Sequence, residues 1–254
     1  MDLAVQLCAY LVGLPLEVLT IAAMLHDGFK RYPFVFGYLI TFFLTTVAEM
    51  PSSVAYYYLR LILPLPNERV DRAAEEYAWW YWRDEAVLQI LVFAVVISLI
   101  YYATARLAAR RIVRVGLIVG AVAFALVSFL VHYQNPAPHV SYGLWATAWT
   151  RDLRVCAAVL DLALWAILIA AREKDSRLLM LTCALGIMFA GEAVGESLRN
   201  LASSFVSHHR GHILSDAGGL LVLISDLGFL YIWWRAFRTP KPPPNEAALR
   251  LHHS

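Results

Sequence analysis

The sequence predicts an all-α membrane protein, a seven-transmembrane helix bundle, and three observations support this fold class. Of the 254 residues, 60% are hydrophobic and only 16% are charged, whereas a soluble domain usually carries about 25% charged residues. The apolar residues gather into runs of about 20 residues or more, the length that crosses a bilayer as a helix. Basic residues cluster in alternate connections between these runs, as they do in membrane proteins with one fixed orientation.

The apolar runs predict seven spans within one transmembrane domain, residues 1–238. The mixed-charge segment 63–81 contains Pro64 and Pro66 and is expected to form a short helix on the outer membrane surface. The proline-rich tail, residues 239–254, is expected to be disordered. The predicted spans are 3–25, 33–58, 84–105, 112–132, 152–171, 178–205 and 214–236.

The basic residues also predict the orientation of the helices. The positive-inside rule makes the connections that they occupy cytoplasmic, so the N-terminus is expected outside and the C-terminus in the cytoplasm. Because these arginines and lysines lie at the ends of apolar runs, they indicate topology and not a nucleic-acid surface. The basic residues are Lys30, Arg31, Arg106, Arg110, Arg111, Arg114, Arg172, Lys174, Arg177, Arg235, Arg238, Lys241 and Arg250.

Carboxylic acids inside the predicted spans are the main functional signal. An ionisable side chain at bilayer depth is costly unless it is paired, neutral or hydrated, so it is expected to face the bundle interior or a water-filled cavity. No lysine lies at depth in a span, which leaves arginines near the outer edge, such as Arg154, as cationic partners. Each acid alone could instead be a neutral group that joins helices by hydrogen bonds. The candidates for a ligand- or proton-binding site are Glu49, Glu85, Asp161, Glu192, Glu196 and Asp226, and Glu17 is a further acid inside a span.

Glycine pairs at helical spacing predict two close-contact faces. The segment Gly191-Glu192-Ala193-Val194-Gly195-Glu196 repeats both glycine and glutamate at i, i+4, which favours close helix approach with acids on the neighbouring face. Gly116 and Gly120 have the same spacing in the fourth span, which contains no acid. That span is expected to face lipid, and it could form a homodimer through these glycines.

Spans one to three and five to seven are predicted to form a parallel repeat, with the fourth span as linker. At an offset of 148 residues, Cys8-Ala9 aligns with Cys156-Ala157, and Ile21-Ala22-Ala23 aligns with Ile169-Ala170-Ala171. Parallel repeats of this kind occur in membrane transporters.

Three residues are candidates for a zinc site near the outer side. His208 and His212 have a spacing that places two imidazoles on one face of a helix, and Asp216 follows one turn later. Gly211 argues against a helix there. The alternative is therefore that the histidines lie in a hydrated loop and that the protein needs no cofactor.

Two aromatic motifs resemble those of a group of uncharacterised bacterial seven-helix integral membrane proteins. The first is Tyr32-Pro33-Phe34 with Tyr38-Leu39. The second is Tyr77-Ala78-Trp79-Trp80-Tyr81-Trp82-Arg83-Asp84-Glu85-Ala86, an aromatic run followed by an acid at the start of the third span. The resemblance covers about spans two and three. It implies a multi-pass protein of the bacterial inner membrane and implies no activity.

These features favour a binding protein over an enzyme. The leading hypothesis is an integral membrane protein that binds a small polar or cationic ligand, or a partner protein, in an outward-facing acid-lined cavity. Its role would be sensor-like or accessory, with a separate cytoplasmic or membrane partner. The alternatives are a small proton-coupled transporter and a zinc-dependent membrane lipid hydrolase.

Overall fold

A computed structural model describes residues 3–63, 67–106, 110–133, 141–172, 175–203 and 209–238. This part of the chain is all-helical, and seven of its helices are long and apolar enough to cross a membrane, so the predicted fold class is confirmed at that level. The predicted tail, residues 239–254, lies outside the described residues. The helices are α1 (Leu3–Asp27), α2 (Pro33–Ile62), α3 (Glu68–Ala103), α4 (Arg110–Tyr133), α5 (Ser141–Ala170), α6 (Ser176–Ser203) and α7 (His209–Arg238), with a 3₁₀ turn η1 (Thr104–Arg106) after α3.

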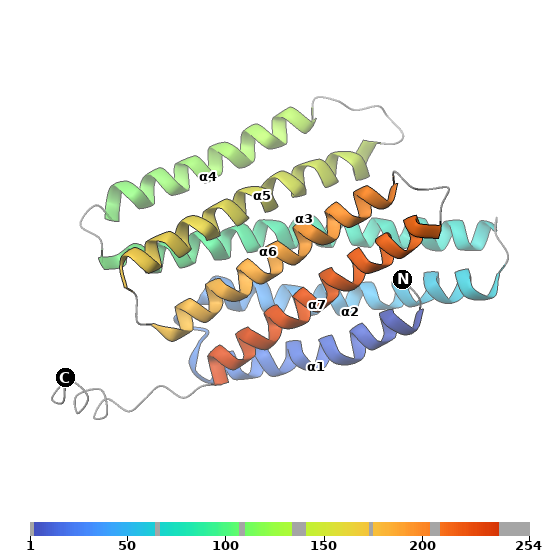
Figure 1. Ribbon diagram of the computed structural model, residues 1–254, viewed down its shortest axis with the longest axis horizontal. Coiled ribbons are helices and arrows are strands. Elements are labelled where there is room, and N and C mark those ends of the chain that lie inside the picture. The colour runs from blue at the N-terminus through green and yellow to red at the C-terminus, as the bar shows by residue number, and fades with distance from the viewer. Residues whose placement is uncertain are drawn as a thin grey trace.

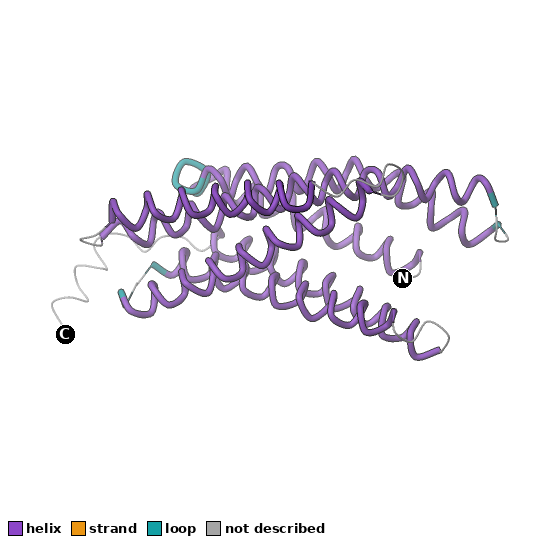
Figure 2. Tube along the Cα trace, turned by 90° about the horizontal axis from the view of Figure 1, so that it is seen from above, coloured by secondary structure: helices purple, strands orange, loops and turns teal. Residues whose placement is uncertain are grey.

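The helices run side by side and alternate in direction along one long axis (Figure 1). The N-terminus and the last residues of α2, α4 and α6 therefore lie at one end of the bundle, called here the N-side. The last residues of α1, α3, α5 and α7 lie at the opposite end, the C-side. Viewed from above, the described chain is helix almost throughout, and its loops are confined to these two ends (Figure 2).

Six helices form a closed ring, and α4 lies outside it. Neighbours in the ring follow the order α1, α2, α3, α5, α6, α7 and back to α1, while α4 contacts mainly α5. This order suits the predicted parallel repeat, but sequential antiparallel packing produces it as well, so the repeat stays a prediction. Because the ring closes, it encloses an interior that α4 does not reach.

Helix α4 presents an apolar surface and is tied to its neighbours by polar contacts at both ends, at the C-side by a hydrogen bond of 2.8 Å from Arg114 to the Tyr101 carbonyl oxygen. Ser128 donates a hydrogen bond of 2.8 Å to Asp152 Oδ2 on α5, and His132 Nε2 lies 3.0 Å from the same oxygen. A Cβ added at Gly116 or Gly120 would meet no atom within 4 Å. Both glycines are thus open to a partner or to lipid, and the homodimer stays a prediction.

Two helices begin more than ten residues earlier than the apolar runs predicted. Helix α3 is continuous over 36 residues and replaces the expected surface helix and third span. It contains no glycine or proline, and the Asn67 side chain caps its first turn by accepting a hydrogen bond from the Arg69 backbone N–H at 3.0 Å. Helix α5 begins at Ser141 and not at 152. Arg154 consequently lies well inside α5 and not at its outer edge.

The close approach of α6 and α7 at the predicted glycine face is confirmed. A Cβ added at Gly191 would lie 1.8 Å from Ser225 Oγ, and one at Gly195 would lie 2.5 Å from Val222 Cγ2. On the facing helix, a Cβ at Gly218 would lie 2.6 Å from the Gly195 carbonyl oxygen. Only glycine fits these positions without displacing the neighbouring helix, so α6 and α7 form one tight wall of the ring.

The C-side half of the ring is filled by apolar side chains. Trp233 is fully buried there and donates its indole N–H to the Leu181 carbonyl oxygen at 3.2 Å, which satisfies the polar atom that a buried tryptophan brings. Its ring lies 4.2 Å from that of Phe229, centroid to centroid. Eight core side chains here are at most 1% exposed: Leu39, Leu99, Leu164, Leu168, Leu181, Leu185, Phe229 and Trp233.

Candidate functional site

The N-side half of the ring encloses a cavity of about 520 Å³, a size typical of small-molecule sites. All six ring helices line it, and no described residue of α4 does. Near the N-side it reaches Ser215 and Asp216, whose side chains are exposed. Towards the C-side it ends on Tyr38, Phe42 and Leu230, where the apolar core begins. The cavity therefore extends from the middle of the bundle to its N-side.

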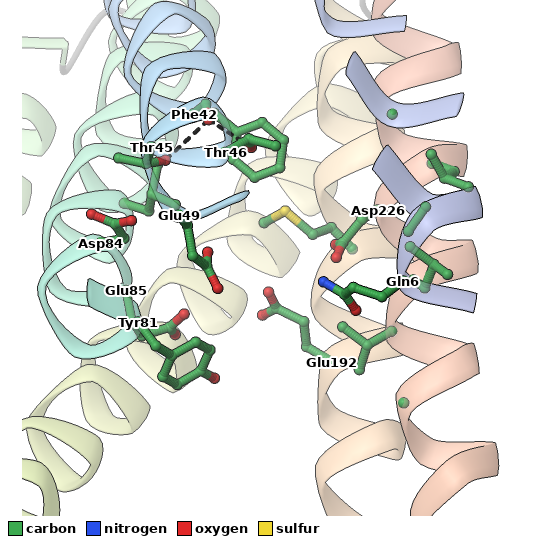
Figure 3. Close-up of a pocket in the computed structure, with 18 of the residues that line it drawn as sticks. Gln6, Phe42, Thr45, Thr46, Glu49, Tyr81, Asp84, Glu85, Glu192 and Asp226 are labelled. Carbon is green, nitrogen blue, oxygen red and sulfur yellow. Dashed lines mark hydrogen bonds between the residues drawn. The ribbon is translucent and has the colours of Figure 1, made fainter. Parts of the chain in front are cut away.

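The structure brings together five of the six acids predicted as ligand- or proton-binding residues. Figure 3 shows Glu49 on α2 and Glu192 on α6 extending towards each other across the cavity, with Asp226 on the α7 wall. Glu85 and Glu196 line the same cavity from α3 and α6. Acids that are far apart in the sequence thus face one space, because each ring helix turns its polar stripe inwards.

Asp161, the sixth predicted residue, does not line this cavity. Its side chain is 1% exposed, and its Oδ2 would lie 3.5 Å from a Cβ added at Gly186 on α6. Oδ1 has no hydrogen-bond partner among the described residues. Asp161 is therefore a buried acid at the contact between α5 and α6, separate from the other five.

Three further acids also line the cavity: Glu17 and Asp84, which were not among the predicted site residues, and Asp216, which was predicted as a metal ligand. Glu17 lies one turn beyond Gly13 and two turns beyond Tyr10 on the same face of α1, and this helical spacing was the signal available in the sequence. Asp84 was assigned to a helix start, and the unexpected length of α3 places it inside the bundle. In all, eight carboxylic acids and two arginines, Arg154 and Arg199, line the cavity.

Arg154 joins three of these acids. Its Nε lies 2.9 Å from Glu192 Oε2, while Nη1 pairs with Glu196 and Nη2 with Glu85. The Gln89 side-chain amide donates to Glu85 at 3.1 Å. The Arg154 side chain is only 14% exposed, so this charge cluster is largely removed from water. One guanidinium therefore links α5 to both α3 and α6.

A smaller cavity of about 260 Å³ lies on the other side of this cluster. It is bounded by α3, α5 and α6 and shares Glu85, Arg154 and Glu196 with the main cavity. Arg151 and Trp82 line only the smaller one. Residues of the Arg154 cluster therefore line both spaces.

Several buried polar atoms around the main cavity have no partner among the described residues. Glu17 is 2% exposed; its Oε1 accepts a long hydrogen bond of 3.4 Å from Thr46, and its Oε2 has no partner. Asp84 Oδ2 and Gln89 Oε1 are also buried and have no hydrogen-bond partner within the described chain. All three atoms are hydrogen-bond acceptors. The walls of the cavity thus present acceptors that a bound molecule or water must satisfy.

Tyrosine side chains complete the lining. Tyr10, Tyr57 and Tyr77 come from three different helices, and the Tyr77 ring stacks on Tyr56 with a centroid distance of 5.6 Å. Tyr38 forms part of the inner end and Tyr81 lies beside Glu85 (Figure 3). Tyrosine offers both a hydroxyl group and a negatively polarised ring face, and the ring face attracts cations.

The predicted zinc site is only partly within the described residues. His208 lies outside them, and although His212 falls in α7, its side chain is not described. The helix does run through Gly211, contrary to the expected loop. Asp216 lines the cavity near its N-side end. Within the ranges that the structure describes, no three metal-ligating side chains form a group, and the zinc site stays a prediction.

The chain matches no protein-family model, no curated protein and no solved structure at a significant level. What the cavity can bind is therefore inferred from its own shape, charge and hydrogen-bonding atoms.

Proposed function

We propose that this protein is a multi-pass membrane protein that binds a small polar or cationic ligand in the cavity, in a sensor-like or accessory role. The observation that carries the proposal is the excess of acids over arginines on the walls of one cavity. An ionisable residue inside the membrane is a functional-site candidate by default, and eight acids around one space concentrate negative potential there.

The proposed orientation places the mouth of the cavity outside the cell, at the bacterial inner membrane. Arg31, between α1 and α2, and Arg114 and Arg177, near the starts of α4 and α6, lie at the C-side, which the positive-inside rule makes cytoplasmic. The N-side would then face outwards, and a ligand would reach the cavity from the periplasm. A reporter active only in the periplasm should give no signal at the C-terminus, and a strong signal would reverse this orientation.

Ligand binding is tested with the purified full chain in detergent. Organic and inorganic cations are compared with uncharged analogues by isothermal titration calorimetry, in wild type and in Glu49→Gln. Wild type should bind cations and the variant should bind them more weakly, because Glu49 extends into the cavity (Figure 3). Should neither the cations nor their uncharged analogues bind, or should Glu49→Gln bind all of them as wild type does, the proposal is wrong.

A small proton-coupled transporter is the second candidate. It is favoured by the depth of the site, since Glu192 and Asp226 lie about halfway along α6 and α7, and transporters bind their substrates near the bilayer midplane. Transport requires the packed C-side half to open at another stage of the cycle. The test is uptake of a bound cation into liposomes, with a dye that reports acidification or alkalinisation of the interior. Uptake with a pH change supports transport, whereas binding without uptake supports the sensor-like role.

A further inference from the structure

The two walls of the cavity differ in how many of their acids have a cationic partner. On the wall formed by α3, α5 and α6, Arg154 pairs with Glu85, Glu192 and Glu196, and of the acids there only Asp84 has no ion pair among the described residues. On the wall formed by α1, α2 and α7, no ion pair involves Glu17, Glu49 or Asp226 within the described part of the chain. A cation that enters the cavity therefore finds most of its unpaired counter-charges on the second wall.

Glu17 marks this wall as a built site. Its side chain is 2% exposed, lines the cavity, and leaves Oε2 without a hydrogen-bond partner among the described residues. A buried carboxylate oxygen with no donor costs free energy unless a bound molecule or water donates to it. Because Glu17 is an acceptor, the complementary group on a ligand is an N–H or O–H donor, and a positive charge strengthens the bond.

The shape of the site favours an organic cation over a single metal ion. The unpaired acids come from three separate helices and are spread along the wall, and no three metal-ligating side chains form a group within the described ranges. The cavity of about 520 Å³ is far larger than one ion requires. Tyr10, Tyr57 and Tyr77 add ring faces of the kind that hold organic ammonium groups.

We infer that the ligand is an organic cation with N–H donors, a primary ammonium or a guanidinium, held by Glu17, Glu49 and Asp226. This inference rests on the proposed binding function and names its ligand class. Arg154 already pairs with Glu85, Glu192 and Glu196 on the opposite wall. The positive charge of the ligand is therefore attracted to the wall formed by α1, α2 and α7. The uncharged remainder of the ligand lies among the tyrosines.

The experiment uses four probes on the full chain in detergent micelles. Butylammonium carries charge and N–H donors, and tetramethylammonium carries charge alone. 1-Butanol carries an uncharged O–H donor, and calcium chloride supplies a point charge. Butylammonium should bind about tenfold more tightly than tetramethylammonium, which is the effect of one charged hydrogen bond. Binding of 1-butanol should be weaker still, because it cannot neutralise the acids.

Two substitutions locate the site. Glu17→Gln should lower the affinity for butylammonium about tenfold. Asp226→Asn should have the same effect and replaces the first variant if that variant folds poorly. Asp161→Asn is the matched control, because Asp161 is an equally buried acid that does not line the cavity, and it should leave the affinity unchanged.

The outcomes separate this inference from the proposed function. If tetramethylammonium or calcium binds as tightly as butylammonium and Glu49→Gln weakens it, the cavity binds cations but the N–H ligand class is wrong. An equal effect of Glu17→Gln and Asp161→Asn would overturn the assignment of the wall. If no cation binds, both the inference and the proposed function fail.

Discussion

On the C-side of the bundle the ring helices meet through leucine, phenylalanine and tryptophan side chains that are at most 1% exposed. On the N-side the same six helices enclose a cavity lined by acids and tyrosines. The change occurs within a turn or two of each helix. On α2, for example, Leu39 is buried in the core, whereas Thr46 and Glu49 face the cavity.

This contrast separates the residues that hold the ring together from those that are available for binding. A filled apolar core gives stability through burial and close contact. A polar cavity lowers stability, because its groups are imperfectly paired, and such sites persist where they serve a function. Variants that change one half at a time therefore show what each half contributes to stability.

The largest effect is expected from Arg154→Gln, which removes the charged link of the N-side half. Glu85, Glu192 and Glu196 would remain close together without a cation. Removing one partner of a buried ion pair costs about 3–5 kcal/mol, and the lower end applies here because Glu196 is 40% exposed. The measurement is the free energy of unfolding in detergent, from chemical denaturation followed by circular dichroism.

Arg151→Gln is the control for this variant, because Arg151 is exposed on the same helix and lines only the smaller cavity. It should change the free energy of unfolding by less than about 0.5 kcal/mol. Adding Glu192→Gln to Arg154→Gln should restore part of the loss by removing one unpaired acid. Equal stability of Arg154→Gln and wild type would contradict the view that this cluster supports the cavity walls.

A comparable or smaller loss of stability is expected when one leucine from each half is shortened. Leu185→Ala should cost about 2–5 kcal/mol, because Leu185 is fully buried in the C-side core and leaves a void there. Leu14→Ala should cost less than about 1 kcal/mol, because its side chain lines the cavity and makes fewer contacts to lose. Denaturation of both variants under one set of conditions checks this, and similar losses would remove the distinction between the halves.

A third comparison tests the close glycine contact between α6 and α7. Gly191→Ala should cost about 1–3 kcal/mol, because the new methyl group would overlap Ser225 across the α6–α7 contact. Gly116→Ala on α4 is the matched control and should cost nothing, since its Cβ would meet no atom. Adding Ser225→Gly to Gly191→Ala should recover stability. If the two alanine variants melt alike, α6 and α7 are not the tight wall behind the acids.

Much of the fold could be predicted from the sequence, because apolar length and the absence of lysine at depth are local properties. The close glycine face of α6 could be predicted for the same reason. The bounds of α3 and α5 could not, since the segments before them are polar and aromatic, which indicates a membrane surface. Only the folded chain shows that both helices begin further towards the N-side.

The site was predicted less completely, and the reason is geometric. Each acid could be assigned to the interior of the bundle from its cost in lipid. Which acids share one cavity depends on how each helix is rotated and on its neighbours in the ring. Asp161 and Glu192 are alike in the sequence, yet one lies at the α5–α6 contact and the other lines the cavity. The threefold pairing of Arg154 is likewise a property of the assembled ring.

The smallest expected effect concerns Tyr32, which precedes α2 at the C-side, outside the membrane-spanning segments. Its side chain is 1% exposed and its hydroxyl has no partner among the described residues. Burial, with the nearby charge of Asp175, raises the pKa of Tyr32 to about 12 from its usual 10. The neutral form is therefore favoured in the folded state. Its stabilising effect is complete below pH 10 and is lost as the pH rises to 12.

Tyr32→Phe removes this dependence. The variant should match or slightly exceed wild type at pH 8, because it deletes an unpaired buried hydroxyl. At pH 11 it should gain a further 1 kcal/mol or so relative to wild type, as the shifted proton equilibrium requires. Denaturation at the two pH values gives this difference directly, with the pH 8 pair as the baseline. If the stability difference between variant and wild type is the same at pH 8 and pH 11, water reaches Tyr32. The C-side half would then not be the dry core that contrasts with the N-side cavity.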